Sequence, residues 1–288
     1  MQKEQKQQIC ERLRAYCDQK GSQNKAANSL NGVSSATISK ALSGQWDTIA
    51  DEMWRTIAAQ IGGKAEGWQV VNTKAYECMT FTLTNAQTDS LVLAVTGDAG
   101  SGKTEAVKNY AAGHANAYHL TCSEYWNRRT FMGKLLKCMG VSVSGTTVGE
   151  MMDDIVDTLK RKDTPLIVLD EADKLTDQVL YFFISLYNQL EGHCGIILTA
   201  TSFLQKRIER GVRLNRKGYA EIYSRIGRKF VKLPMLNSED IAAVCVANGL
   251  NDNKGINRII NESEGDLRRV KRSVWATLKG GALWKAKH

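Results

Sequence analysis

Apolar residues in the first part of the chain recur with the spacing of amphipathic α-helices. Ile9, Leu13 and Tyr16 follow one another at i, i+4 and i+7, so they form one stripe on a helix. Similar patterns between turn and capping residues predict three further helices: a short one from Ala26 to Leu30, one that Ser34 or Ser35 caps, and one from Asp47 to Ile61. We therefore predict an all-helical N-terminal domain spanning residues 1–63.

The turn between the second and third of these helices contains Asn31-Gly32, two residues that tolerate positive φ. A short helix, a turn and a helix with small polar residues is the pattern of a helix-turn-helix. Its second helix would present Ser35, Thr37 and Lys40, which can reach bases and phosphates in a major groove. The stretch resembles the repressor-like helix-turn-helix family, with a turn one residue longer. A helical bundle used for protein contacts fits the same pattern.

Beyond a predicted linker at 62–67, the pattern changes to short, continuous apolar runs. Such runs are expected of strands buried on both faces, and they occur at 91–95, 166–169 and 196–198, with weaker candidates at 117–120 and 230–233. Helical stretches lie between them, so we predict an α/β core with a parallel sheet, residues 64–233. From Pro234 onward only helices are expected, at 238–248, 254–262 and 266–278, which predicts a small C-terminal helical lid, residues 234–288.

One segment after the first predicted strand fits the motif G-x-x-x-x-G-K-[ST] in full. Its members are Gly97, Asp98, Ala99, Gly100, Ser101, Gly102, Lys103 and Thr104. The glycines allow backbone N–H groups to turn toward phosphates, and the helix that follows adds its positive end. Lys103 would reach the β and γ phosphates, and the Thr104 hydroxyl would ligate Mg²⁺. The segment therefore predicts a P-loop that binds ATP with Mg²⁺.

Two adjacent acids follow the apolar run at 166–169. Asp170, at the strand end, suits the Mg²⁺ shell, and Glu171 could polarise the attacking water as a general base. Two acids after a strand are weak evidence alone, because helix N-caps look the same. Behind a P-loop they indicate ATP hydrolysis.

Charge is unevenly distributed along the chain, whose formal net charge is +9. Nine Lys or Arg between 206 and 229 stand against only Glu209 and Glu221. A field this concentrated favours a polyanion partner, although a solvated surface loop is an equal alternative. No apolar run approaches the ~18–20 residues that span a bilayer, and the N-terminus is polar, so we expect a cytoplasmic protein with no membrane partner. The 7 scattered Cys are expected to be reduced packing thiols.

The core resembles the AAA+ ATPases. Thr201 matches their polar sensor 1 position, Arg225 their trans-acting arginine finger, and Arg268 the sensor 2 arginine of the lid. The residues also allow simpler interpretations. Thr201 could cap the following helix, Arg225 could be one more surface base, and Arg268 could serve helix pairing or DNA contact.

Within the AAA+ proteins, nearly the whole chain is similar to the MuB-type transposition ATPases of phage Mu and related transposons. The shared order is a helix-turn-helix, a P-loop ending Gly-Lys-Thr-Glu-Ala that includes Glu105, the string Asp-Glu-Ala-Asp, then Ser-Arg-Ile and Gly-x-Leu-Arg. Thr73 lies where such proteins wrap the adenine. The resemblance implies ATP-dependent helical filaments on double-stranded DNA with little sequence preference, and delivery of that DNA to a DDE transposase.

Arg128 and Arg129 follow the second core strand, where related ATPases place DNA-contacting loops; a solvated helix start is the alternative. Two other functions stay open. The same core would suit a helicase loader or insertion-sequence helper, with an obligate helicase or transposase partner. A nucleotide-sensing transcription regulator would instead read a defined operator through the helix-turn-helix.

Overall fold

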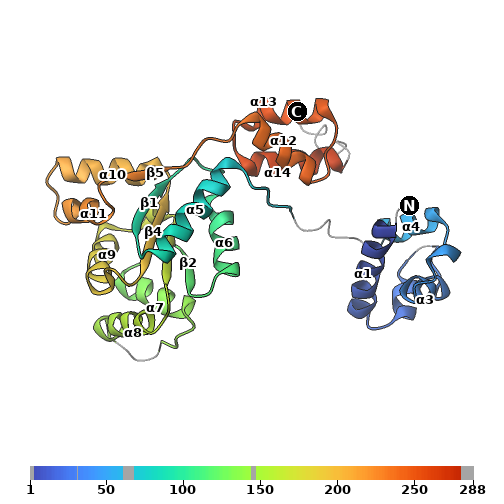
Figure 1. Cartoon of the computed structure of the whole chain (residues 1–288), viewed down its shortest axis with the longest axis horizontal. Coiled ribbons are helices and arrows are strands. Elements are labelled where there is room, and N and C mark those ends of the chain that lie inside the picture. The colour runs from blue at the N-terminus through green and yellow to red at the C-terminus, as the bar shows by residue number, and fades with distance from the viewer. Residues whose placement is uncertain (1–2, 31, 61–67, 144–146, 280–288) are drawn as a thin grey trace. The chain divides into compact units, whose positions relative to one another are not determined.

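The computed structural model describes residues 3–30, 32–60, 68–143 and 147–279 (Figure 1). Contacts within the chain divide it into two compact units, Met1–Gln69 and Val70–His288. The predicted linker at 62–67 and the predicted boundary at residues 63 and 64 lie outside the described residues. Within the described part of the chain, no helix is long and apolar enough to cross a membrane.

The N-terminal unit is helical, as predicted. It contains α1 (Lys3–Lys20), α2 (Gln23–Asn28), α3 (Ser35–Leu42) and α4 (Asp51–Gln60). Gly21, at φ +80°, ends α1, and the side chain of Ser22 caps α2 by accepting a hydrogen bond from the backbone of Lys25. The core of the unit is formed by residues that include the fully buried Leu13 and Trp54. The use of α2 and α3 as a helix-turn-helix stays a prediction.

The helix predicted from Asp47 to Ile61 is interrupted. Trp46–Thr48 form a short 3-10 turn, η1, and Ile49 then adopts an extended backbone before α4 begins at Asp51. The extended residue places Ile49 in the core of the unit, where it is 6% exposed. Burial of this side chain therefore overrides the local helical pattern. Ile61 lies outside the described residues.

The second unit is built on a five-stranded, all-parallel sheet. The strands are β1 (Val92–Thr96), β2 (Ala117–Thr121), β3 (Leu166–Asp170), β4 (Gly195–Ala200) and β5 (Phe230–Lys232), in the spatial order β2-β3-β4-β1-β5. The predicted α/β core with a parallel sheet is confirmed. In such a sheet, ligands bind at the carboxyl ends of the strands, so those ends locate the candidate site.

Helices cover both faces of the sheet (Figure 1). On one face α5 (Lys74–Thr88) and α6 (Lys103–Gly113) pack against strand residues such as Leu166 and Val168. The opposite face, with Ile167 and Leu169, packs against α7 (Arg128–Cys138), α8 (Val148–Lys160), α9 (Asp177–Leu190), α10 (Ser202–Arg213) and α11 (Tyr219–Arg225). Because successive side chains point to opposite faces, a strand covered on both sides must be apolar throughout.

The helices α12 (Ser238–Ala247), α13 (Asn253–Ser263) and α14 (Leu267–Leu278) follow the last strand, where the sequence predicts the lid. A lid as a domain of its own stays a prediction, and the name is kept for these three helices. Hydrogen bonds between described residues tie the lid to the core. The backbone N–H of Lys74 donates to the Asp240 carboxylate over 3.2 Å, and the N–H of Leu267 donates to the Gly100 carbonyl over 3.0 Å. The lid therefore contacts the loop between β1 and α6 directly.

We predict that Gly195→Ala destabilises the protein. A Cβ at this position would lie 2.1 Å from the backbone oxygen of Ala86 on α5, so the sheet and the helix would have to separate. Overpacking of this kind costs about 1–3 kcal/mol or more. Gly113→Ala is the matched control, because a Cβ at Gly113 meets no atom within 4 Å. Urea unfolding should show a lower midpoint for Gly195→Ala only; equal midpoints would contradict the packing of α5 on β4.

Candidate nucleotide site

The loop that connects β1 to α6 has the backbone of a phosphate-binding loop. Gly100 and Gly102 have φ of +77° and +90°, a region that glycine adopts without a Cβ penalty. Gly102 is the N-cap of α6 and provides no side-chain cap. The first N–H groups of the helix are therefore available to an anion, and the helix dipole favours negative charge there.

Lys103, the first residue of α6, folds back over this loop. Its Nζ donates to the carbonyls of Gly97 and Asp98 over 2.7 and 2.8 Å and lies 3.3 Å from Ser101 Oγ. Burial lowers the pKa of Lys103, and the carboxylates of Asp170 and Asp98 partly offset this effect. The ammonium is thus held in the concave side of the loop, where phosphate oxygens would replace the carbonyls as partners.

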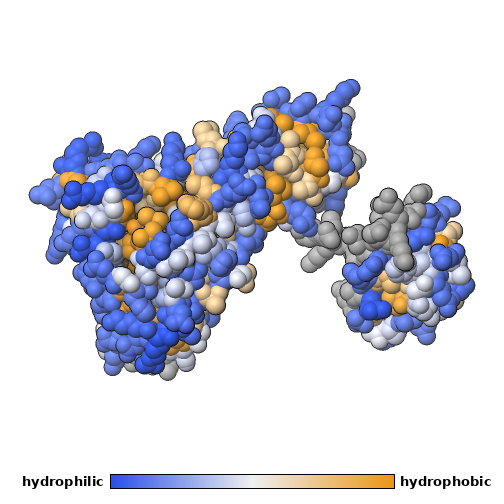
Figure 2. Space-filling view, viewed as in Figure 1, coloured by the Kyte–Doolittle hydropathy of each residue, from blue (hydrophilic) through white to orange (hydrophobic). Residues whose placement is uncertain are grey.

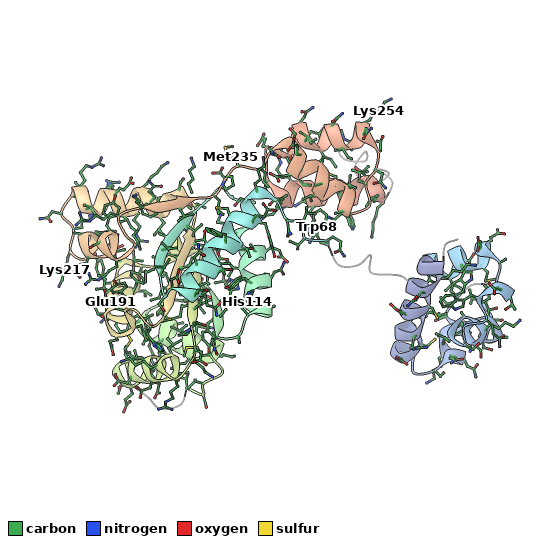
Figure 3. The ribbon with its side chains drawn as sticks, viewed as in Figure 1. Trp68, His114, Glu191, Lys217, Met235 and Lys254 are labelled. Carbon is green, nitrogen blue, oxygen red and sulfur yellow. The ribbon has the colours of Figure 1, made fainter. Side chains whose placement is uncertain are left out.

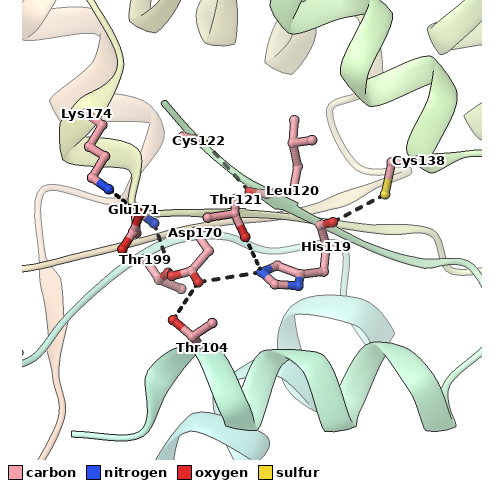
Figure 4. Close-up of polar contacts among 10 residues, drawn as sticks. All are labelled: Thr104, His119, Leu120, Thr121, Cys122, Cys138, Asp170, Glu171, Lys174 and Thr199. Atoms are coloured by element: carbon pink, nitrogen blue, oxygen red, sulfur yellow. Dashed lines mark hydrogen bonds and ion pairs between the residues drawn. The ribbon is translucent and has the colours of Figure 1, made fainter. Parts of the chain in front are cut away.

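Asp170, the last residue of β3, is the charged centre of the site (Figure 4). Its carboxylate is 1% exposed and accepts hydrogen bonds from Thr104 Oγ1 over 2.8 Å and from the backbone N–H of Glu171 over 3.0 Å. The hydroxyl of Thr199 on β4 also donates to it. His119 Nε2 on β2 lies 3.5 Å away. Four elements thus converge on one buried carboxyl group.

These partners keep Asp170 ionised. Burial acts to raise the pKa of its carboxyl, but hydrogen bonds from His119, Thr199 and Thr104 outweigh burial, and the pKa lies below its ordinary value. No group of three or more His, Cys, Asp or Glu that could hold a metal occurs among the described residues. A carboxylate beside a hydroxyl is a donor set that could hold Mg²⁺ together with phosphates and water.

Glu171 begins a turn that the sequence pattern does not predict. Its backbone is left-handed, with φ 56° and ψ 40°, and it is the N-cap of the 3-10 helix η2 (Ala172–Lys174). Its carboxylate pairs with Lys174 Nζ over 2.5 Å. Because both side chains are well exposed, the pair contributes little to stability and can break readily. A non-glycine residue in this region is a strained conformation that recurs at functional sites.

Thr201 and Arg225 lie away from the P-loop contacts. Thr201 caps α10, as the simpler interpretation suggested, and also donates to Asp173 Oδ2 over 2.8 Å, so it touches the acidic turn. Arg225 ends α11, where its Nη2 donates to Asn188 over 3.2 Å and its guanidinium lies 5.0 Å from the Tyr187 ring. Its partners are therefore on α9.

The lid reaches the P-loop at the start of α14. Asp266 caps this helix, and a Cβ on Gly100 would lie only 2.0 Å from Asp266 Oδ1. Arg268 is exposed in the first turn of α14, and its charge acts with burial to lower the pKa of Lys103. The predicted sensor 2 residue is thus within electrostatic reach of the phosphate-binding lysine.

The other predicted site residues fall in three places. Thr73 is buried and caps α5 by accepting from the Tyr76 N–H. Asp98, Ala99 and Glu105 are exposed around the P-loop, and Arg128 and Arg129 are exposed in the first turn of α7. In the N-terminal unit, Ser35 and Lys40 are exposed on α3, while Thr37 is half-buried and lies 2.9 Å from Ser34 Oγ.

Thr199 and His119 contact Asp170 but are not predicted from the sequence. The signal for Thr199 is a hydroxyl inside an apolar run, which is fully buried in the structure. A buried hydroxyl requires a partner, and Asp170 on the neighbouring strand supplies it. No local signal marks His119, because its contact with Asp170 depends on the pairing of β2 with β3.

Comparison with known proteins agrees with this geometry. Residues 86–208 match the AAA domain family. The chain is also 25% identical over 268 residues to the Mu-like prophage FluMu DNA transposition protein B of Haemophilus influenzae, across 88% of this chain and 91% of that protein. The resemblance to MuB-type transposition ATPases is therefore confirmed.

Solved structures share the fold of this AAA domain. Cdc6p from Pyrobaculum aerophilum has a TM-score of 0.51 at 17% identity, covering 72% of this chain and 62% of its own. The Aeropyrum pernix ORC1 protein, solved in complex with DNA, also scores 0.51 at 17% identity, covering 71% and 60%. NtrX from Brucella abortus, solved with ATP, scores 0.50 at 14% identity, covering 87% and 61%. The chain therefore spans between 60% and 62% of the length of these structures, and the likeness shows the fold.

We predict that Thr199→Val makes the AAA domain less stable in a pH-dependent way. The depressed pKa of Asp170 contributes stability that is present above the unfolded pKa of about 3.9 and is lost as pH falls through the folded pKa. Removing one stabilising hydroxyl should cost about 1–3 kcal/mol at neutral pH, and the loss should shrink in acid. Urea unfolding of the variant and the wild type between about pH 3 and about pH 7 measures this loss of unfolding free energy.

Thr82→Val is the matched control for this experiment. Thr82 is also buried, but its hydroxyl donates to the Cys78 carbonyl within α5, away from any carboxylate. Its cost should therefore not change with pH. A constant cost for Thr199→Val across the same pH range would show that Thr199 does not stabilise the charge on Asp170.

Proposed function

We propose that this chain is an ATP-dependent, largely sequence-nonspecific DNA-binding ATPase. It would oligomerise as helical filaments on duplex DNA and deliver target DNA to a DDE transposase. The observation that supports this most is the hydrogen bond of Thr104 to the buried Asp170 behind a complete P-loop, in a chain similar to a DNA transposition protein.

The P-loop supplies what ATP binding needs. The N–H groups at the start of α6 and the ammonium of Lys103 would hold the phosphates, while Thr104 and Asp170 would hold Mg²⁺. Mg²⁺ neutralises charge on the phosphates when it is bound. The segment that ends at Thr73 would wrap the adenine. The hydrogen bond of the next residue, Lys74, to Asp240 of the lid supports this, because it holds the segment between the core and the lid. Once the ion pair with Lys174 breaks, the Glu171 carboxylate would accept the proton of the attacking water.

A basic surface on α10 and the segment that follows it supports a DNA partner. Lys206, Arg210 and Arg213 are exposed at i, i+4 and i+7, so they form one row on α10. The segment that follows α10 adds further exposed cations: Arg216, Lys217, Arg228 and Lys229. Figure 2 shows mostly hydrophilic surface in this region, and Lys217 lies at its outer end in Figure 3. Such cations contact phosphates without reading sequence.

Two other elements would add to DNA binding. Arg128 and Arg129 stand in the first turn of α7, where positive charge opposes the helix dipole. Arg128 lies 5.9 Å from the Phe182 ring of α9, while both side chains stay exposed. Because the dipole of α7 gains nothing from either charge, an external anion would be a favourable partner for them. In the N-terminal unit, the exposed Ser35 and Lys40 of α3, with Thr37 between them, would contact a groove.

The position of Arg225 supports assembly of the protein into filaments. Arg225 is bound to α9, and its Nε is buried without a hydrogen-bond partner among the described residues. Figure 1 places α11 on the opposite side of the core from the lid helices that contact the P-loop. An arginine there would serve the nucleotide of a neighbouring subunit, so ATP would join protomers into a filament. Thr201 and Arg268 would sense the same nucleotide from the acidic turn and from the lid.

We predict that Lys103→Ala abolishes ATP binding and ATP-dependent coating of DNA, because no other cation lies inside the loop among the described residues. Lys108→Ala, exposed on the same helix, should leave both unchanged. Titration with a fluorescent ATP analogue and electron microscopy with duplex DNA measure the two properties. Nucleotide affinity within about threefold of wild type, under 1 kcal/mol, would contradict the assignment of the P-loop.

A second prediction concerns Arg225. Arg225→Ala should bind ATP normally but hydrolyse it at least about tenfold more slowly, because a finger acts on the transition state of the neighbour's nucleotide. Arg161→Ala, an exposed arginine at the end of α8, is the control. Mixing Arg225→Ala with Lys103→Ala should restore some turnover, since one subunit gives the site and the other the finger. Wild-type hydrolysis by Arg225→Ala on DNA would exclude it as the finger.

A further inference from the structure

Arg207 is a cation of the basic segment that points inward. Its side chain is 17% exposed, whereas its neighbours Lys206 and Arg210 are exposed. The guanidinium donates to the backbone carbonyl of Asp173 over 3.2 Å and to that of Leu175 over 2.6 Å. It also pairs with the carboxylate of Asp177, the first residue of α9. One side chain on α10 thus spans the whole turn that follows Glu171.

Tyr219 holds this guanidinium in place. Its hydroxyl accepts from Arg207 Nε over 3.1 Å and donates to Asp177 Oδ1 over 2.7 Å. The ring is 1% exposed and packs directly on α10, because a Cβ on Gly211 would lie 2.3 Å from it. The arginine therefore has one orientation, fixed by a second element.

The turn that Arg207 spans needs an external support. It begins at Glu171 in the left-handed conformation, which is strained for a non-glycine residue. Thr201 supports the turn through Asp173, but only at one side chain. Arg207 binds two backbone carbonyls and the start of α9, and hydrogen bonds from a charged donor are stronger than neutral ones. The geometry of the Glu171 turn therefore depends on α10.

We propose that Arg207 is a positioning residue for ATP hydrolysis, which holds the turn that carries Glu171 in the orientation that hydrolysis requires. The inference rests on the proposed function, because it assumes that Glu171 acts on the attacking water. Arg207 touches neither the P-loop nor the Asp170 carboxylate in its hydrogen bonds, so it should affect turnover and not nucleotide binding. It also joins the turn to the helix whose outer row faces DNA in the proposed function.

The test compares Arg207→Met, Arg207→Lys and Tyr219→Phe in the full chain, with duplex DNA present. Arg207→Met should lower kcat at least about tenfold and leave the affinity for ATP within about threefold of wild type. Arg207→Lys should recover part of the loss, because one ammonium can reach some of the acceptors. Tyr219→Phe, which keeps the ring and loses the hydroxyl, should have a smaller effect in the same direction.

Two controls separate positioning from stability. Ile208→Val removes one methylene from a fully buried side chain on the same helix, so it lowers stability slightly and should keep the wild-type kcat. Arg258→Met removes an arginine from the lid, where it contacts Thr277, and should also be neutral. A wild-type kcat in Arg207→Met, or a parallel loss of ATP affinity, would overturn the proposal. Absence of hydrolysis in the wild type would instead overturn the proposed function itself.

Discussion

The burial of one negative charge organises the second unit. A carboxylate that is 1% exposed remains ionised only if its surroundings replace water, and Asp170 obtains that replacement from several elements at once. Thr104 brings the start of α6, Thr199 brings β4, and the Glu171 N–H brings the turn after β3. Thr104 and the turn that carries Glu171 are also where a nucleotide would be bound or attacked. Two of the contacts that solvate the charge therefore also build the site.

The local part of this arrangement could be predicted from the sequence. The P-loop is a continuous segment whose glycines and lysine have one common use, and the strands are continuous apolar runs because both faces of the sheet are covered. Thr199 and His119 could not be found this way. Their contacts with Asp170 depend on the order and register of β2, β3 and β4, which neighbouring residues do not encode. The break at Ile49 was missed for a related reason, since tertiary burial overrode the helical pattern.

The basic segment shows the limit of counting charges. From composition alone, every Lys and Arg between 206 and 229 belongs to one field. In the structure the cations on α10 are of two kinds. Lys206 and Arg210 face solvent, while Arg207 points inward and binds backbone carbonyls and Asp177. A guanidinium can leave water in this way because its planar set of donors meets several acceptors at once. The side of the helix on which a cation lies, and not its charge, decides what it does.

The contact between Gly100 and Asp266 constrains the loop from outside as well as from within. No room for a methyl group exists between them, and the Gly100 carbonyl accepts the N–H of Leu267. The backbone of the loop and the first turn of α14 are therefore mechanically coupled. Any rearrangement that rotates the Gly100 peptide must either carry the lid helix with it or break their hydrogen bond. If the loop widened or tightened around a nucleotide, the lid would therefore tilt with it, because Gly100 is the point at which the loop and α14 are in contact.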